Sequence, residues 1–530
     1  MAAAPAPQPV DPKSPPARPR GRLALTLFVG LAAALAFALV FTAFAPRLLF
    51  WQLVDLSPSP TNPPDVNRAI DTLRQVEDPG VRITTPTNRV INWRLLFPAL
   101  AHYLHLSRTA FLALPFVGVF LALAYAGWVV AVGSGDRRLA FLATALAGTA
   151  SWFFVSTGWL AYFDAWYVLG MLLASFTPSR WILFLVALLS PWVDERFLLA
   201  LPLCLVVRGI GLGMGWGAGQ GREPGRIKVG SRLMGELGLC VLAAFPYVAV
   251  RLASLALDRH ESSAAHVKEH LATLPGFGSL LEGLWFGLRL DWAFVAVAVA
   301  ATFVRRGSLW GVGLFLMILA TLATNLAMAH DLSRSVSTLM PVVVLGMVLL
   351  ARSPRRHVAW IFAGLLLGNL ALPAAHVVAG WDDRIRLHNL FSEWKGYTMP
   401  SSLSAEVAVS RGKSYMERKE LPKALECFEK AVRDFPDLAQ GHLQLGMCLH
   451  RMERLNEAEE AFSVAVKRFP DEPMFVYFRG LVRFSLGMEA GAERDLQRAL
   501  DLAPPGAYFR PDTEQKLAQL RARAAKASPR

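Results

Sequence analysis

Long apolar runs dominate the first three quarters of the sequence and restrict the possible fold more than any other feature. From Leu23 to about Gly380 these runs follow one another with short breaks, and the first, Leu23 to Ala45, carries no charge. A helix needs about 20 such residues to cross the ~30 Å of hydrocarbon in a bilayer. Hydrophobic residues make up 54% of the chain, whereas about 45–50% is typical of soluble domains. The sequence therefore predicts a polytopic membrane protein.

The predicted transmembrane domain covers residues 23–380 and contains about 11 segments. Residues 1–22 precede it and are rich in Pro and Ala, so we expect them to be disordered. Three of the runs are short for a full crossing, and the first two of these could instead form a re-entrant hairpin. The apolar runs are 23–45, 109–132, 139–158, 166–177, 181–193, 197–207, 233–257, 284–304, 307–328, 336–351 and 358–380, of which 166–177, 181–193 and 197–207 are the short ones.

Basic residues predict how the chain is oriented in the membrane. If the N-terminus is cytoplasmic, the inner segments are 1–22, 133–138, 178–180, 208–232, 305–306 and 352–357, and each of them carries Lys or Arg. The four short outer loops carry only Arg196, Arg259, Lys268 and Arg334. Positive charge favours the cytoplasmic side. The odd number of crossings then places the C-terminal part outside the cytoplasm. The Ala-, Leu- and Arg-rich composition favours a bacterial inner membrane, and the net charge of +14 lies mostly in these inner loops, which argues against nucleic acid as a partner.

Residues 405–506 repeat with a period of 34, in blocks that start at Ala405, Ala439 and Pro473. Each block has Gly at position 8, Ala at position 20, Phe or Leu at position 24 and Ala at position 27. A Pro follows the second helix of each block. This pattern resembles the tetratricopeptide repeat family, which implies an α-solenoid of three helix pairs. Residues 381–404 are then a linker, and 507–530 form a capping helix and tail, with Asp512 as its predicted N-cap. The predicted fold class is all-α throughout.

The resemblance to tetratricopeptide repeats implies a protein or peptide partner. Arrays of this family usually bind on the concave face formed by the first helix of each pair. The alternative is that the chain's own linker fills this groove, or that the groove docks on the membrane domain. The residues that we expect to line the groove are Lys413, Met416, Leu443, Met447, His450, Tyr477, Leu481 and Phe484.

Ionisable residues gather at the predicted outer ends of the apolar runs. Such residues are costly near a bilayer, so their placement indicates a functional site. A carboxylate can deprotonate an acceptor hydroxyl, and the planar fork of Arg binds two phosphate oxygens. The predicted catalytic residues are Asp55, Asp164, Asp194 and Glu195, and the predicted phosphate- or substrate-binding residues are Arg196, His330, Asp331 and Arg334.

The long first outer loop (46–108), the acid near its start, the acid in Tyr162-Phe163-Asp164-Ala165 and the basic later loops resemble the GT-C superfamily of multi-spanning glycosyltransferases. The resemblance implies transfer of a sugar from a polyprenyl-phosphate donor to an acceptor outside the cytoplasm, with the repeats recruiting that acceptor or a partner. Asp55 departs from the pattern because it lacks an adjacent acid. The four cysteines have no paired metal-ligand spacing, and of the outer-loop histidines only His266 and His270 lie at helical i,i+4 spacing, so the sequence leaves a role for a divalent metal open. The competing hypothesis is a non-catalytic membrane scaffold that displays the repeats for envelope protein assembly.

Overall fold

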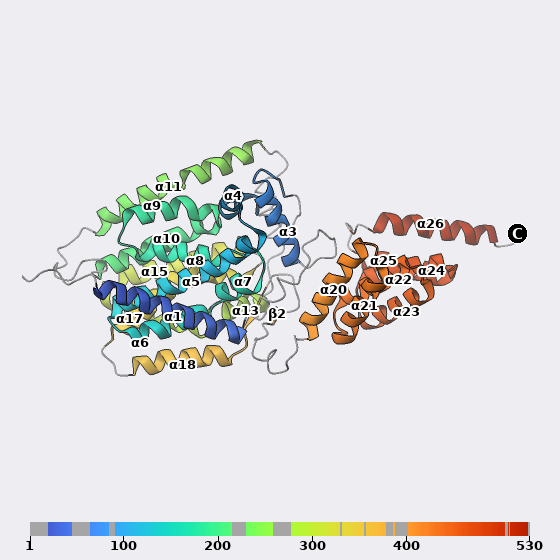
Figure 1. Cartoon of the computed structure of the whole chain (residues 1–530). Coiled ribbons are helices and arrows are strands. Elements are labelled where there is room, and N and C mark those ends of the chain that lie inside the picture. Colours follow the sequence, from blue (N-terminus) through green and yellow to red (C-terminus); the bar gives the residue numbers. More distant parts are fainter. Residues whose placement is uncertain are drawn as a thin grey trace, which may run out of the picture. The chain divides into compact units, whose positions relative to one another are not determined.

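The computed structural model describes residues 20–44, 64–83, 91–214, 229–257, 277–328, 331–353, 357–377, 385–386, 401–503, 507 and 509–527. The chain separates into two compact units (Figure 1). We call residues 1–46 with 71–390 the membrane unit, and residues 391–530 with 47–70 the repeat unit. In the described residues both units are built from helices, apart from one antiparallel hairpin of β1 (Ala375–His376) and β2 (Ile385–Arg386). The all-α prediction is confirmed.

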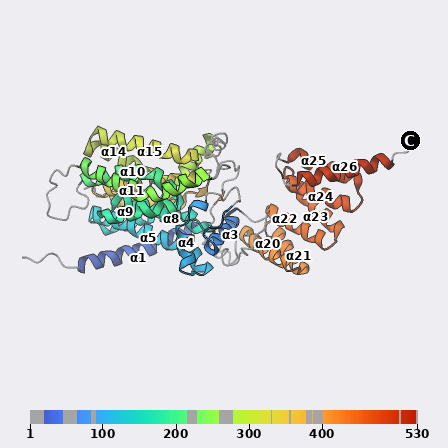
Figure 2. The same ribbon diagram turned by 90° about the horizontal axis from the view of Figure 1, so that it is seen from above.

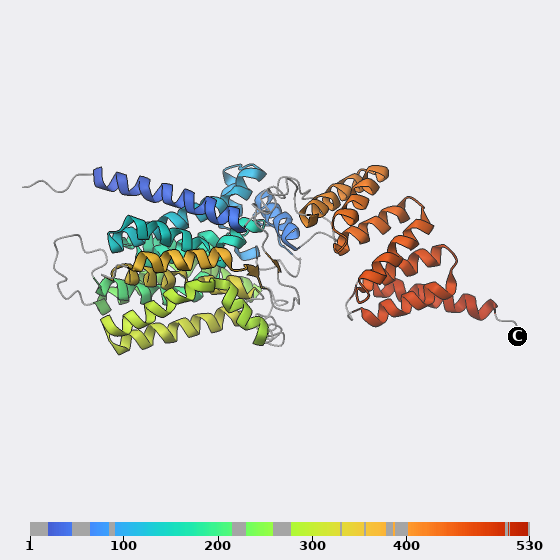
Figure 3. The same cartoon turned by 90° about the horizontal axis from the view of Figure 1, so that it is seen from below.

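The membrane unit is a bundle of helices that run alongside one another (Figures 1 and 3). Helix α3 (Pro64–Glu77) contributes residues 71–77 to this unit. The other helices are α1 (Arg20–Phe44), α4 (Leu96–Tyr103), α5 (Arg108–Ser134), α6 (Arg137–Gly148), α7 (Ser151–Gly158), α8 (Asp164–Phe176), α9 (Arg180–Leu189), η2 (Ser190–Trp192), α10 (Arg196–Gly213), α11 (Val229–Leu257), α13 (Phe277–Leu288), η3 (Arg289–Asp291), α14 (Trp292–Arg306), α15 (Ser308–Met328), α16 (Leu332–Ser335), η4 (Val336–Leu339), α17 (Met340–Ala351) and α18 (Val358–Ala371).

Seven helices of the described residues are long and apolar enough to cross a membrane, and an eighth span results if the bent pair α6–α7 is one crossing. Three shorter apolar helices complete the set: α8, the α9–η2 stretch and α18. Each predicted apolar run thus has a helix in the structure, but not always the predicted length. Helix α10 reaches 18 residues although its run looked short. Helices α6 and α7, predicted as one segment, are bent by 62°.

The two ends of the membrane unit differ in what they carry. Arg352 donates to the carbonyl of Gly133 (2.7 Å) and Arg306 to that of Gly213 (3.2 Å), so the predicted inner loops meet at the end where α1 begins. The opposite end carries α4, α7, α13 and the β1–β2 hairpin (Figure 1). Four of the six predicted inner segments thus contact one another in pairs, and the orientation in a membrane stays a prediction.

The repeat unit consists of three helix pairs followed by a final helix (Figure 2). Each Gly at the eighth position faces the residue at position 24 of its own block: a Cβ on Gly412, Gly446 or Gly480 would lie 2.4, 2.4 or 2.9 Å from Phe428, Phe462 or Leu496. The predicted close approach of the paired helices is therefore present. The helices are α20 (Ser401–Glu417), α21 (Leu421–Asp434), α22 (Ala439–Arg451), α23 (Leu455–Arg468), α24 (Pro473–Ser485), α25 (Glu489–Leu502) and α26 (Arg510–Ala527).

The prediction that Asp512 caps the last helix is wrong by one turn. Helix α26 begins at Arg510, so Asp512 lies inside its first turn. The Asp512 carboxylate accepts a hydrogen bond from the hydroxyl of Tyr477 (2.8 Å), and the hydroxyl of Thr513 donates to the carbonyl of Phe509 (2.7 Å). Asp512 thus joins the last helix to α24 through Tyr477 and does not cap it.

Two glycines of α22 give a matched test of the repeat packing. We expect Gly446→Ala to destabilise residues 401–530 by about 1–3 kcal/mol, because overpacking forces neighbours to move. Gly441→Ala should instead be neutral or stabilising, because its Cβ would lie 3.5 Å from the nearest atom and Ala favours a helix over Gly. Thermal unfolding followed by circular dichroism measures both. Equal effects would contradict the close approach at Gly446.

Candidate functional site

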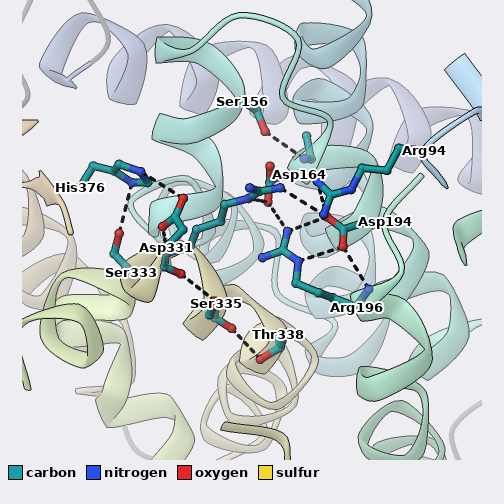
Figure 4. A network of polar contacts seen from close by, with 12 residues as sticks. Arg94, Ser156, Asp164, Asp194, Arg196, Asp331, Ser333, Ser335, Thr338 and His376 are labelled. Atoms are coloured by element: carbon teal, nitrogen blue, oxygen red, sulfur yellow. Dashed lines mark hydrogen bonds and ion pairs between the residues drawn. The ribbon is translucent and has the colours of Figure 1, made fainter. Parts of the chain in front are cut away.

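Four of the predicted outer-end residues meet in one buried group of ion pairs (Figure 4). Arg196 Nη2 lies 2.8 Å from Asp164 Oδ1 and 2.7 Å from Asp194 Oδ2. The guanidinium of Arg334 donates to Asp164 Oδ1 through Nε and lies 3.3 Å from Asp194 Oδ2. These residues come from the starts of α8, α10 and α16 and from the turn before α10. The fold therefore brings together side chains up to 170 positions apart.

Arg94 joins this group, although the sequence did not single it out. Its Nε and Nη2 donate to the two carboxylate oxygens of Glu195 at 3.0 and 2.9 Å, and its Nη1 lies 3.3 Å from Asp194 Oδ2. Nothing in the local sequence distinguishes Arg94 from Arg82 or Arg108 nearby, so only the tertiary contact shows its place. We call Arg94, Asp164, Asp194, Glu195, Arg196 and Arg334 the ion-pair cluster.

Local hydrogen bonds fix the backbone at each contributing segment. The hydroxyl of Ser156 accepts from the N–H of Ala165 (2.9 Å) at the start of α8. Asp194 Oδ1 accepts from the N–H of Arg196 (3.0 Å), and Asp331 Oδ1 accepts from the N–H of Arg334 (3.1 Å) as N-cap of α16. Helix starts have free N–H groups that acidic side chains satisfy well. The acids are thus held at helix ends that aim the arginines inward.

The two central carboxylates are buried and paired with arginines. The side chain of Asp164 is 0% exposed and that of Asp194 is 3% exposed. Burial by itself raises the pKa of Asp164, but the charges of Arg334 and Arg196 outweigh it and hold that pKa below its usual range. The pKa of Asp194 is lowered in the same way, with Arg196 and Arg94 overcoming burial. Three arginines face three carboxylates, so the cluster is electrically balanced.

Asp164 and Asp194 differ in how their oxygens are used. Both oxygens of Asp194 accept hydrogen bonds, from the backbone and side chain of Arg196 and from Arg334. Asp164 accepts both arginines through Oδ1, whereas its buried Oδ2 has no hydrogen-bond partner among the described residues. Buried polar atoms without partners are rare and call for an explanation such as a catalytic role. Asp164 Oδ2 is therefore the oxygen best placed to accept a proton.

Asp331 belongs to a second group beside the cluster (Figure 4). Its Oδ2 lies 3.1 Å from Nε2 of His376, and Nδ1 of that ring lies 3.3 Å from the hydroxyl of Ser333. His376 comes from β1, directly after the last membrane helix, and packs 4.7 Å from the ring of Trp159. The sequence prediction did not include His376. Asp331 thus pairs with a histidine and is not part of the arginine network.

The remaining predicted residues of this end are Asp55 and His330, and both lie outside the described residues. Among the residues that the structure does describe, no group of three or more His, Cys, Asp or Glu side chains is arranged to hold a metal ion. The carboxylates of the cluster face guanidinium groups. Arginine cannot be deprotonated in proteins and has no acceptor to offer a metal, so these residues suit an anionic ligand better than a cation.

The predicted groove of the repeat unit is partly covered by the unit itself. Tyr477 stacks on Phe509 with ring centroids 4.8 Å apart, and Lys516 and Arg523 of α26 each lie 5.1 Å from the ring centroid of Phe484. Lys413 and Met416 are buried, and Leu443 is half-buried. The other three predicted residues border a pocket of about 80 Å³, which is lined by Met447, His450, Arg451, Phe462, Phe478, Leu481 and Val482.

Comparisons with known proteins bear on the repeat unit. Residues 409–473 and 451–507 match the family model of the tetratricopeptide repeat. Solved structures similar to the chain include the first tetratricopeptide domain of Spaghetti (RPAP3) bound to the HSP90 peptide SRMEEVD, at 22% identity over 23% of this chain and 95% of that chain, with a TM-score of 0.22. The first such domain of human RPAP3, solved by NMR, is 22% identical over 24% of this chain and 98% of that chain, with a TM-score of 0.22. A search of the curated proteins finds no match. The C-terminal part of the chain thus carries tetratricopeptide repeats.

Proposed function

We propose that the protein is a membrane glycosyltransferase that moves a sugar from a polyprenyl-phosphate donor to an acceptor outside the cytoplasm. The observation that supports this most is the convergence of Asp164 with Arg196 and Arg334 at one end of the membrane unit. The repeats indicate protein–protein interaction, and in this proposal they bind the acceptor or a protein that delivers it.

The cluster contains the groups that such a reaction needs. The acceptor oxygen attacks the anomeric carbon of the sugar while the bond from that carbon to the phosphate oxygen breaks. The phosphate leaves with the bonding electron pair, and guanidinium groups at this end of the membrane unit, Arg94 among them, stabilise the charge that develops there. The acceptor hydroxyl gives its proton to Asp164 Oδ2, the carboxylate oxygen without a partner among the described residues.

A membrane-anchored scaffold is the second candidate, and one observation favours it. All six charged groups of the cluster already neutralise one another, and ion networks of this kind also occur as purely structural elements. In that case the membrane unit only anchors the repeats, and the cluster holds the outer ends of the helices together.

A transfer assay distinguishes the two candidates. The purified full-length protein in lipid nanodiscs is incubated with a panel of polyprenyl-phosphate monosaccharides and a protein extract as acceptor. Release of polyprenyl phosphate, together with labelled acceptor, supports the transferase. If no donor in the panel is turned over, while the repeats still capture a protein partner, the scaffold is the better description.

The proposal places both the cluster and the repeats outside the cytoplasm. We expect alkaline phosphatase fused after Pro400 to be active and a reporter that fluoresces only in the cytoplasm to be dark there, because the chain makes an odd number of predicted crossings. Fusions within the loop after α10 should give the opposite pattern, because the predicted inner loops carry the positive charge. Inverted results at both positions would refute the orientation.

A further inference from the structure

We propose that the donor phosphate is bound by Arg94, Arg251 and the hydroxyl of Tyr247, and that Glu195 occupies the place of this phosphate until the donor arrives. This inference rests on the proposed function for the identity of the donor. It assigns the phosphate site to residues other than Arg196 and Arg334, which the sequence pointed to.

The Arg94–Glu195 pair is the most easily opened contact of the cluster. Glu195 is held by Arg94 through two parallel hydrogen bonds, and its side chain is 36% exposed. The side chain of Asp194 is 3% exposed and accepts hydrogen bonds from Arg196 and Arg334. It also forms an ion pair with Arg94. Glu195 can therefore turn into solvent, whereas Asp194 cannot leave without exposing several charges. A phosphate presents the same two-oxygen edge as a carboxylate to the guanidinium fork, so it can take the place of Glu195.

Arg251 supplies a second cation beside the segment that carries Arg94. It lies near the outer end of α11, with its guanidinium carbon 3.9 Å from the ring centroid of Trp93, the residue before Arg94. Among the described residues, no carboxylate lies within ion-pair distance of Arg251. A guanidinium stacked on an aromatic ring keeps its N–H edge free for an anion. Arg251 is therefore held in position and still has donors to offer.

Tyr247 gives independent support for a ligand at this place. It precedes Arg251 by one helical turn on α11, so both side chains face the same side. The ring of Tyr247 packs 5.0 Å from that of Trp192, just before the segment that carries Glu195. Tyr247 is 3% exposed, and its hydroxyl has no hydrogen-bond partner among the described residues. Tyr247 and Arg251 thus contact Trp192 and Trp93, which lie close in sequence to Glu195 and Arg94, so this side of α11 adjoins the proposed phosphate position.

The surroundings suit a phosphate carried by a lipid. Helix α11 exposes large apolar side chains along its length, including Val241, Phe245 and Leu252 at 62, 64 and 60%. An isoprenoid chain can lie against this face while its phosphate meets Arg251 and Arg94 at the level of the headgroups. Basic groups near the membrane surface attract anionic headgroups. The arrangement thus favours an amphipathic phosphate over one free in solution.

Binding of a long-chain polyprenyl phosphate to the full-length protein tests the site without any sugar transfer. Native mass spectrometry in detergent gives the affinity for this lipid, for the uncharged polyprenol and for inorganic phosphate as a competitor. We expect Arg94→Gln and Arg251→Gln to weaken binding by about 10–100-fold, the range for a lost charge-assisted hydrogen bond. Glu195→Gln should tighten binding several-fold, because the competing carboxylate charge is gone. Arg180→Gln, on an exposed side chain at the opposite end of the bundle, serves as the control and should change nothing.

The tighter binding expected for Glu195→Gln cannot result from misfolding, because a misfolded protein does not bind the lipid more tightly. Unchanged affinity in Arg94→Gln, weaker binding in Glu195→Gln, or equal binding of polyprenol would each overturn the proposal. Binding of inorganic phosphate without binding of polyprenyl phosphate would overturn the lipid source. If the lipid binds as expected but no donor sugar is ever transferred, the phosphate site stands and the transferase function fails.

Discussion

Replacement of Asp164 by asparagine is expected to lower the rate of sugar transfer by about 10²–10⁴-fold, the usual effect of removing a general base. The amide oxygen of the substituted side chain can still accept hydrogen bonds from Arg196 and Arg334, which Asp194 continues to neutralise. We therefore expect a folded variant of reduced stability that has lost the proton acceptor at Oδ2. Release of polyprenyl phosphate by the purified variant, compared with its thermal unfolding temperature, separates the two effects.

Asp136→Asn is the matched control for this experiment. Asp136 is also an acid at the start of a membrane-unit helix, where it accepts hydrogen bonds from the N–H groups of Arg138 and Leu139. It lies in a predicted inner loop and is exposed, so its replacement should leave the transfer rate nearly unchanged. Equal rates for wild type and Asp164→Asn would show that another group takes the proton. His376, paired with Asp331, would then be the next residue to test.

The repeats could be predicted from the sequence almost completely, because their packing is local. Gly446 and Phe462 belong to adjacent helices of one block, and their contact follows from a fixed spacing of 16 residues. The coverage of Tyr477 by Asp512 and Phe509 was not predictable in the same way. The repeat pattern predicts the contacts within each helix pair, whereas the contacts of the last helix depend on how individual side chains pack.

The membrane unit shows where apolar patterning stops being informative. The run 139–158 reads as one helix, but it breaks at Thr149, whose carbonyl accepts from Arg289 (2.6 Å) and whose hydroxyl accepts from Asn369 (2.8 Å). Arg289 and Asp291 lie inside another predicted apolar run, 284–304, and both are fully buried. A break in one helix is therefore stabilised by polar groups from two others. A hydropathy average over a single run hides such partners.

The candidate site was predictable in part for a comparable reason. Asp164, Asp194 and Arg334 stand out because charge is costly at the ends of apolar helices. Arg94 does not stand out, because it lies in a long loop with other arginines, and its contact with Glu195 spans 101 positions. The sequence indicated which charges are unusual. It could not show which of these side chains contact one another. Nor could it show that both oxygens of Asp194 accept hydrogen bonds, whereas only one oxygen of Asp164 does so among the described residues.

Asp194→Asn is expected to destabilise the membrane unit strongly, where Asp164→Asn mainly affects the rate. Asp194 is the carboxylate that Arg94, Arg196 and Arg334 share. Without its charge, three buried or nearly buried arginines face only Asp164 and Glu195. Removal of one partner from a buried ion pair typically costs about 3–5 kcal/mol. Thermal unfolding of the purified protein should therefore begin at a clearly lower temperature in this variant.

Glu195→Gln is the control. Glu195 follows Asp194 and also pairs with Arg94, but its side chain is 36% exposed. Exposed ion pairs contribute about 0–1 kcal/mol to the free energy of unfolding. The pH dependence gives a second readout. In the folded protein Arg196 and Arg94 lower the pKa of Asp194 despite its burial. The ionised carboxylate therefore stabilises the fold fully above the pKa of the unfolded state, which is about 4. This stabilisation is lost as the pH falls from there towards the lower pKa of the folded state. The wild type should keep its unfolding temperature from pH 7 to about pH 4 and lose it below, and Asp194→Asn should lose this part of the acid sensitivity. If both variants lose little stability at pH 7, Asp194 does not hold the arginines, and the cluster must be organised around Asp164 instead.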